Sequence, residues 1–188
     1  MRTLLFLLEE LSAKDLLQVL VPRLLGPASE RVCCRYLTFE GKQDLERNIG
    51  PKIRGWRTPD TKFVILRDQD SGDCRTVKER LVALIPEARR SHCVVRVACR
   101  ELESWFLGDW HAVAQAFERP TLANLSKKRK YLSPDTLGNP HQELQRHVPA
   151  FQKRDGARRI GPVLELQEGR NSSRSFQTFC AAIRRLAE

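Results

Sequence analysis

Four short apolar runs divide the first hundred residues of the chain, near residues 3–8, 32–38, 62–67 and 93–99. They are rich in Leu, Val, Ile and Phe and have the length of strands that are buried on both faces of a sheet. Between them, apolar residues recur every three or four positions, which predicts helices. This alternation predicts an α/β protein with a doubly wound, mainly parallel sheet.

Several polar residues and prolines mark where the predicted helices begin and end. Ser12 and Asp15 have the spacing of a capping box, with aspartate in place of glutamate. Asp73 has the position of an N-cap before the helix that follows the third strand. Pro22 and Pro51 lie inside helical patterns, so we expect the first helix to kink or end early and the second to bend or break.

The pattern changes at Thr121, where the strand–helix alternation stops. The clearest helix of this region is the last one, with Phe176, Phe179, Ile183 and Leu186 on one face. We therefore expect residues 1–120 to form the α/β core. Residues 121–188 would be a basic helical extension that packs on the edge of the sheet as part of the same domain.

Composition narrows the class of protein. The chain has 188 residues with 41% hydrophobic content, enough for one domain with a real core. No apolar run approaches a membrane span, and the apolar N-terminus meets Glu9 and Glu10 without a cleavage site for a signal peptide. Its six cysteines include no C-x-x-C pair, which disfavours a zinc site or a disulfide framework. We therefore expect a cytoplasmic protein without membrane contact.

The net charge of +10 is unevenly distributed. Residues 121–188 carry 13 Lys and Arg against 6 Asp and Glu, so most of the excess lies in the last third. Such an asymmetry predicts a polyanionic partner, most simply DNA or RNA, although a basic surface that only aids solubility is equally compatible with it. The candidate phosphate contacts lie in two basic segments: Lys127, Lys128, Arg129, Lys130, Lys153, Arg154, Arg158 and Arg159.

Carboxylates follow three of the predicted strands. Glu9 follows the first, Asp68 and Asp70 follow the third, and Glu101 or Glu103 follows the fourth. The carboxyl ends of parallel strands share one edge of the sheet, which is where ligands of open α/β sheets bind. Several carboxylates meeting there repel one another unless a hard cation such as Mg²⁺ neutralises them. The alternative is a solvated turn that caps the next helix.

These motifs resemble the Toprim (topoisomerase–primase) fold, and most closely the small stand-alone Toprim-like proteins related to OLD-type nucleases. The resemblance covers most of the chain. It implies that Glu9, Asp68, Asp70 and Glu103 are catalytic metal ligands. The segments that carry it are Leu8–Ser12, Glu40–Leu45, Leu66–Cys74, Arg100–Asp109 and Asn171–Phe176.

The resemblance implies a nuclease dependent on Mg²⁺ or Mn²⁺ that cleaves phosphodiester bonds, with Lys42 offering its ammonium to a phosphate unless it is simply solvated. Related proteins are often encoded beside an AAA/ABC-type ATPase, which implies an ATPase partner and a role as effector in phage defence. Glu10 is a departure, since the family usually has glycine there. Two alternatives are a non-catalytic regulatory subunit of an ATPase and a haloacid-dehalogenase-like phosphatase, whose Asp-x-Asp motif normally follows the first strand.

Overall fold

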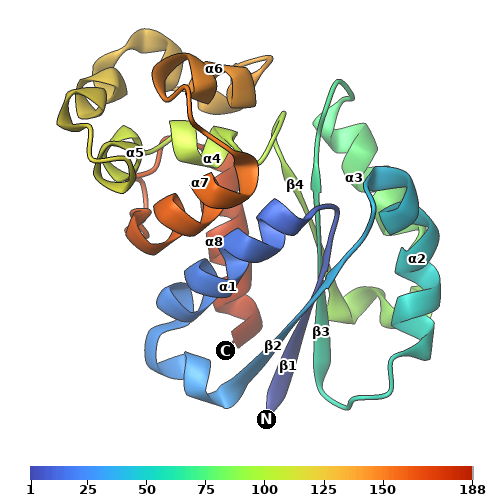
Figure 1. Cartoon of the computed structure of the whole chain (residues 1–188). Helices are drawn as coiled ribbons and strands as arrows, with labels where there is room; N and C mark the ends of the chain where they lie inside the picture. The colour runs from blue at the N-terminus through green and yellow to red at the C-terminus, as the bar shows by residue number, and fades with distance from the viewer. Residues whose placement is uncertain (188) are drawn as a thin grey trace.

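A computed structural model describes residues 1–187 of the chain. Its centre is a sheet of four strands in the order β2-β1-β3-β4, and all of the strand pairs are parallel. The predicted parallel α/β sheet is thereby confirmed, with each strand within two residues of its expected bounds (Figure 1). The strands are β1 (Arg2–Leu8), β2 (Val32–Thr38), β3 (Thr61–Asp68) and β4 (Cys93–Ala98).

Helices cover both faces of the sheet. On one face lie α2 (Lys42–Gly55) and α3 (Cys74–Ala83), and on the other lie α1 (Leu11–Leu25) and α8 (Arg174–Ala187) (Figure 1). Because successive strand residues point to opposite faces, β1 contributes Leu5 and Leu7 to the core under α2 and α3. Its Leu4, Phe6 and Leu8 enter the core under α1 and α8. From Leu4 to Leu8 both faces of β1 are fully buried, which explains the continuous apolar sequence there.

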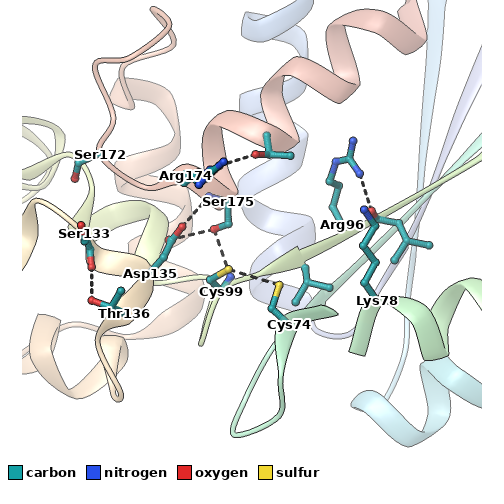
Figure 2. Close-up of a pocket in the computed structure, with 13 residues that line it drawn as sticks. Cys74, Lys78, Arg96, Cys99, Ser133, Asp135, Thr136, Ser172, Arg174 and Ser175 are labelled. Carbon is teal, nitrogen blue, oxygen red and sulfur yellow. Dashed lines mark hydrogen bonds between the residues drawn. The ribbon is translucent and has the colours of Figure 1, made fainter. Parts of the chain in front are cut away.

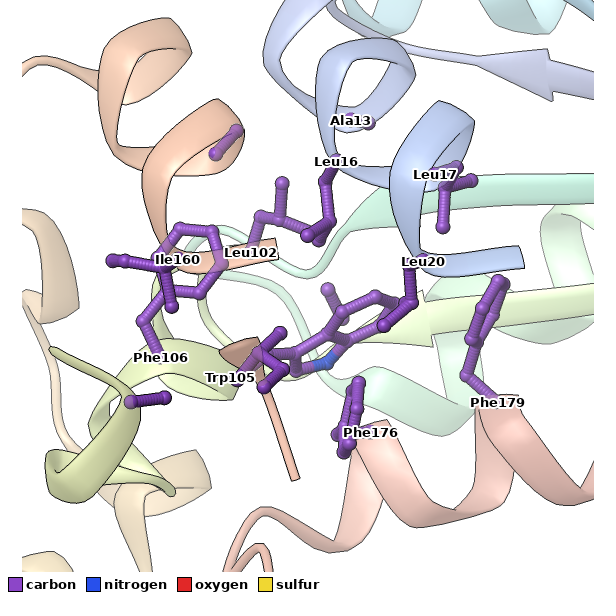
Figure 3. Packing of buried hydrophobic residues seen from close by; sticks show 14 of the residues in the cluster. Ala13, Leu16, Leu17, Leu20, Leu102, Trp105, Phe106, Ile160, Phe176 and Phe179 are labelled. Carbon is purple, nitrogen blue, oxygen red and sulfur yellow. The ribbon is translucent and has the colours of Figure 1, made fainter. Parts of the chain in front are cut away.

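The larger core is built around Trp105, which has no exposed surface. Its ring lies against Phe176 and Phe179 of α8 and close to Leu20 of α1 (Figure 3). The Trp105 indole N–H donates to Ser175 Oγ at 2.9 Å, so the ring is buried without an unsatisfied donor. This packing joins α8, from the end of the chain, to the first helix.

The chain after β4 is mostly helical and closes over one end of the α1 face. It contains α4 (Ser104–Leu107), α5 (Trp110–Ala116), α6 (Pro140–His147) and α7 (Lys153–Ile160). Leu144, Phe151 and Ile160 belong to the core under α1 and α8. We expected this region to pack on the edge of the sheet; α8 instead covers a face, because its apolar stripe matches the surface that α1 leaves open. The 3₁₀ helices are η1 (Gly26–Arg31), η2 (Glu87–His92), η3 (Pro120–Lys127), η4 (Arg129–Tyr131), η5 (Pro134–Thr136) and η6 (Gly161–Val163).

Of the expectations about helix ends, the Ser12 capping box and an early end at Pro22 are wrong, and the Asp73 cap is confirmed. The first helix begins at Leu11 rather than after Ser12, whose buried hydroxyl donates to Glu10. The same helix continues past Pro22 to Leu25, because its buried apolar face outweighs the missing backbone donor. Asp73 does cap α3, accepting hydrogen bonds from the backbone N–H groups of Arg75 and Thr76.

Within residues 1–187 no helix has the length and apolarity that crossing a bilayer requires.

Candidate metal centre

The first two predicted ligands meet at the carboxyl ends of β1 and β3. The Glu9 carboxylate accepts a hydrogen bond from the backbone N–H of Asp68 at 3.1 Å. It also lies 3.7 Å from Nε of Arg67, a side chain that is only 3% exposed. Burial raises the pKa of Glu9, as do the nearby charges of Asp70 and Glu10, whereas the Asp68 N–H and Arg67 oppose this shift. Residues 59 positions apart in the sequence thus share one site, as predicted from the topology.

Glu103 enters the same edge from the start of α4. Its side chain is fully buried, and neither carboxylate oxygen has a hydrogen-bond donor within residues 1–187. The nearest cationic groups are His141 Nδ1 at 3.9 Å and Lys153 Nζ at 4.0 Å, both too distant for hydrogen bonds. A buried carboxylate without donors is costly, so Glu103 has an unfilled demand for a cation or a donor.

Asp68 lies between these groups, at the end of β3. Burial raises its pKa well above the usual range, and the charges of Glu10, Glu103 and Glu9 push in the same direction, while Lys153 opposes them. We call Glu9, Glu10, Asp68 and Glu103 the acidic cluster. Its members compete for positive charge, because several carboxylates cannot all ionise in a small buried volume without compensation.

Lys153, at the first position of α7, brings a second cation to the acidic cluster, in addition to Arg67 beside Glu9. Its Nζ lies 3.4 Å from Glu10 Oε2 and 4.0 Å from Glu103 Oε2. Burial alone would lower the pKa of Lys153, but Glu103, Glu10 and Asp68 outweigh burial and raise it. The sequence suggested that Lys153 contacts nucleic acid; the structure places it between carboxylates instead.

Asp70, the other half of the Asp-x-Asp motif, is engaged by basic side chains. Its backbone φ is +57°, and its Oδ2 lies 3.0 Å from Lys42 Nζ and 3.3 Å from Arg67 Nη2. Arg67 also binds Glu46 at 2.7 Å, on the α2 and α3 side of the sheet. Asp70 is therefore compensated by two cations of the chain. Lys42, expected to face a phosphate, contacts Asp70 through an ammonium that remains half-exposed.

The acidic cluster fits a hard divalent cation in its chemistry. All four side chains offer carboxylate oxygens, the ligands that Mg²⁺ and Mn²⁺ prefer. The Glu103 oxygens without donors point to the same demand. In residues 1–187, however, no three acidic, histidine or cysteine side chains are arranged as a ready-made metal cage. An ion bound among these carboxylates would compete with Lys153, whose Nζ lies 3.4 Å from Glu10 Oε2 and 4.0 Å from Glu103 Oε2.

His141 is a site residue that sequence reasoning missed, since it was treated as structural. It follows the Asn139-Pro140 start of α6, and its backbone N–H donates to Glu101 at 2.7 Å. Glu101 thus binds the backbone at the start of α6. Of the two carboxylates predicted to follow the fourth strand, Glu103 is therefore the one in the acidic cluster. Glu103 raises the pKa of His141, while burial opposes the shift. Nothing in the local sequence indicates this contact.

The basic residues of the last third divide into paired and unpaired groups. Arg154 and Arg158 both bind Asp15 of α1, and Arg159 binds Asp155 within its own helix. Lys130 contacts the buried Glu143. The remaining candidates are exposed and have no acidic partner within residues 1–187: Lys127, Lys128 and Arg129. In the described part of the chain, residues 1–187, these are the three of the eight predicted contacts that are unpaired and could bind phosphate.

Fold and site together define a parallel α/β protein with an acidic centre at the carboxyl edge of its sheet. The chain belongs to the family described as a domain of unknown function, DUF4276, whose profile matches residues 8–184. The match spans the whole acidic cluster together with Lys153 and His141. No curated protein and no solved structure matches the chain.

Proposed function

We propose that the protein is a divalent-metal-dependent nuclease of the Toprim type, acting on phosphodiester bonds of DNA or RNA. The observation that supports this most directly is Glu103, a fully buried carboxylate whose two oxygens lack donors and which lies beside Asp68 and Lys153. A buried anion with this environment has a physical reason to bind a cation. The Toprim resemblance supplies the reaction class.

Glu9, Asp68 and Glu103 would hold the metal, with Glu10 as an additional ligand in the place of the usual glycine. The chemistry that Mg²⁺ or Mn²⁺ supplies when bound is activation of a water molecule and neutralisation of charge on the leaving oxygen. Arg67 orients two of the acidic groups, since it contacts both Glu9 and Asp70. In this proposal Asp70 positions Lys42, whose half-exposed ammonium would offset the charge of the substrate phosphate.

The substrate would approach across α6. Lys130 of η4 contacts Glu143 of α6, and His141 of the same helix faces Glu103. The unpaired Lys127, Lys128 and Arg129 thus flank the helix whose inner side reaches the acidic cluster. Three phosphate contacts and a net charge of +10 support an affinity for nucleic acid that falls with salt.

Two further parts of the proposal rest on the resemblance to Toprim-like proteins. The nuclease would act in the cytoplasm, and an AAA/ABC-type ATPase would be its partner in a defence system against phage. Co-purification of the tagged protein with an ATPase encoded beside it tests the partnership. Cleavage by the protein alone, unchanged by adding that ATPase, would contradict it.

The decisive experiment incubates the protein with linear DNA, plasmid and RNA in Mg²⁺ or Mn²⁺, with and without EDTA. Glu103→Gln and Asp68→Asn should each lower metal-dependent cleavage by roughly a hundredfold or more, as for other losses of buried charge stabilisation. The matched control is Asp73→Asn, because Asp73 is an exposed carboxylate that only caps α3. Cleavage that resists EDTA, or that survives both substitutions, would contradict the proposal.

A regulatory role is a second candidate, favoured by Lys153. Because this lysine already compensates the acidic cluster from within the chain, the cluster is viable without a metal. In that case the protein would show neither divalent-ion binding nor cleavage, yet would still change the activity of an ATPase partner. Hydrolysis of p-nitrophenyl phosphate without cleavage of nucleic acid would instead favour the haloacid-dehalogenase-like phosphatase.

A further inference from the structure

A cavity of about 410 Å³ lies along the outer edge of β4, and none of its lining residues belongs to the acidic cluster (Figure 2). Helix α3 contributes Cys74 and Lys78 to it, and α8 contributes Arg174 and Thr178. Three consecutive residues of β4, 95–97, also line the cavity. Since β4 is the last strand in the order β2-β1-β3-β4, this edge has no strand partner within residues 1–187.

The backbone of β4 points hydrogen-bonding groups into this cavity. The Ala98 carbonyl accepts from the Gln69 N–H at 2.9 Å, so the backbone groups of Ala98 face the β3 side. Neighbouring residues of a strand point their backbone groups to opposite sides, so those of Val95 and Val97 face outward. Cys99 follows the same alternation, and its N–H donates outward to Ser175 Oγ at 3.3 Å. Val97 has no such partner within residues 1–187, so a strand-like donor and acceptor are available.

The cavity also has an excess of positive charge. Lys78, Arg96 and Arg174 line it, and none of them forms an ion pair within residues 1–187. Arg96 is half-buried; its Nη1 donates to the Val95 carbonyl at 2.8 Å, while its Nε is buried without a partner. The carboxylate that lines the cavity, Asp135, is already occupied by hydrogen bonds from two serines. The half-buried guanidinium of Arg96 therefore has no carboxylate partner within residues 1–187, and a carboxylate from a bound molecule would compensate its charge.

We propose that the outer edge of β4 binds an extended, acidic segment of a partner protein as a fifth strand. Side chains of paired strands meet on the same face of a sheet. On β4, Val95 and Val97 belong to the core on the α3 side. Arg96 lies on the α8 side, because it pairs with Leu66, whose side chain is in the core on that side. The bound segment therefore alternates acidic residues, which contact Arg96, with apolar residues. Main-chain hydrogen bonds give such complexes their affinity, and the alternating side chains give specificity.

A second copy of this chain fits the edge poorly. Pairing β4 with β4 of another copy would bring Arg96 of one chain close to the basic side chains around the other cavity. Each chain carries a net charge of +10, so the repulsion extends beyond the pair. The charges select a partner of the opposite sign.

The test uses a fluorescein-labelled, end-capped peptide of eight residues that alternates glutamate with valine, measured by fluorescence anisotropy. It should bind saturably, and Arg96→Gln should weaken binding at least tenfold. Arg35→Gln is the matched control, because Arg35 is an exposed arginine on β2, the strand at the opposite edge of the sheet. Melting curves of both variants verify that they fold, and amide exchange at Val97 should slow when the peptide binds.

Two N-methylated peptides separate strand addition from simple anion binding. Methyl groups on alternate residues block the N–H groups that face β4 in one peptide and the outward N–H groups in the other. The peptide that is methylated on the N–H groups facing β4 should lose at least tenfold in affinity, while the peptide methylated on the outward N–H groups should keep its affinity. Equal binding of both, equal binding of a lysine–valine peptide, full displacement by a short oligothymidylate, or no saturable binding would each overturn the proposal.

Discussion

Replacing Lys153 with methionine removes the ammonium group from the acidic cluster while keeping a side chain of similar length. Its ammonium lies 3.4 Å from Glu10 and 4.0 Å from Glu103. The substitution leaves four carboxylates at one edge of the sheet without this cation. We therefore expect the metal-free variant to be less stable than the parent protein at neutral pH.

The distances set the size of the effect. At an effective dielectric constant of about 20, the Coulomb attraction is roughly 5 kcal/mol for the Glu10 pair and 4 kcal/mol for the Glu103 pair. Solvent screens the Glu10 pair, because the side chains of Glu10 and Lys153 are 31% and 36% exposed. Glu103 is fully buried, and removing the partner of a buried charge costs about 3–5 kcal/mol. We expect a loss of about 3 kcal/mol, or a melting temperature lower by about 6–12 °C for a chain of this size.

Divalent ions should reverse most of this loss. An ion present at a hundred times its dissociation constant stabilises the folded state by about 2.7 kcal/mol. In the parent protein the ion competes with Lys153 for Glu10 and Glu103, whereas in Lys153→Met these carboxylates have no such competitor. The variant should therefore gain more from Mg²⁺ or Mn²⁺ than the parent protein does.

The assay is a set of thermal and urea unfolding curves with EDTA and with millimolar Mg²⁺ or Mn²⁺. Lys52→Met serves as the control, because Lys52 is exposed on α2 and has no ion pair within residues 1–187. The control should unfold as the parent protein does in both conditions. Equal metal-induced shifts in Lys153→Met and the parent protein, or a loss below about 1 kcal/mol, would refute the electrostatic reasoning.

Three other outcomes follow from the structure. Because the folded-state pKa of Asp68 is raised, the metal-free protein should lose stability as pH rises from about 3.9 through that raised pKa. Asp68→Asn should make the stability less dependent on pH in urea titrations, and it should stabilise the protein at neutral pH. Gly108→Ala should destabilise by about 1–3 kcal/mol in the same assay, since the new Cβ would lie 2.1 Å from Oδ1 of the buried Asn171. Replacing the unpaired Lys127, Lys128 and Arg129 with glutamine should reduce the slope of log affinity against log salt concentration by about 3, as measured by filter binding. An unchanged slope would exclude these residues as phosphate contacts.

The sheet and the position of its acidic edge could be predicted from the sequence because both depend on local patterns. A run such as Phe63 to Leu66 has the length and β-branched content of a buried strand, and its neighbours in the chain show helical spacing. Parallel strands place their carboxyl ends at one edge, so Glu9 and Asp68 had to meet once the strands were recognised. The Asp73 cap is equally local, since it bonds backbone groups two and three residues ahead.

The partners of each carboxylate depend on contacts that no local pattern encodes. Asp68 and Asp70 are two residues apart, yet Asp70 has a φ of +57° and contacts Lys42 and Arg67, while Asp68 lies in the acidic cluster. Lys153 reaches that cluster from 85 positions beyond Asp68, only because α7 packs across α1. From the sequence, the basic segment that contains Lys153 predicted that this lysine contacts phosphate. Charge in a sequence reports how many cations exist, but tertiary packing decides which anion each one neutralises, because Coulomb attraction depends on separation and burial.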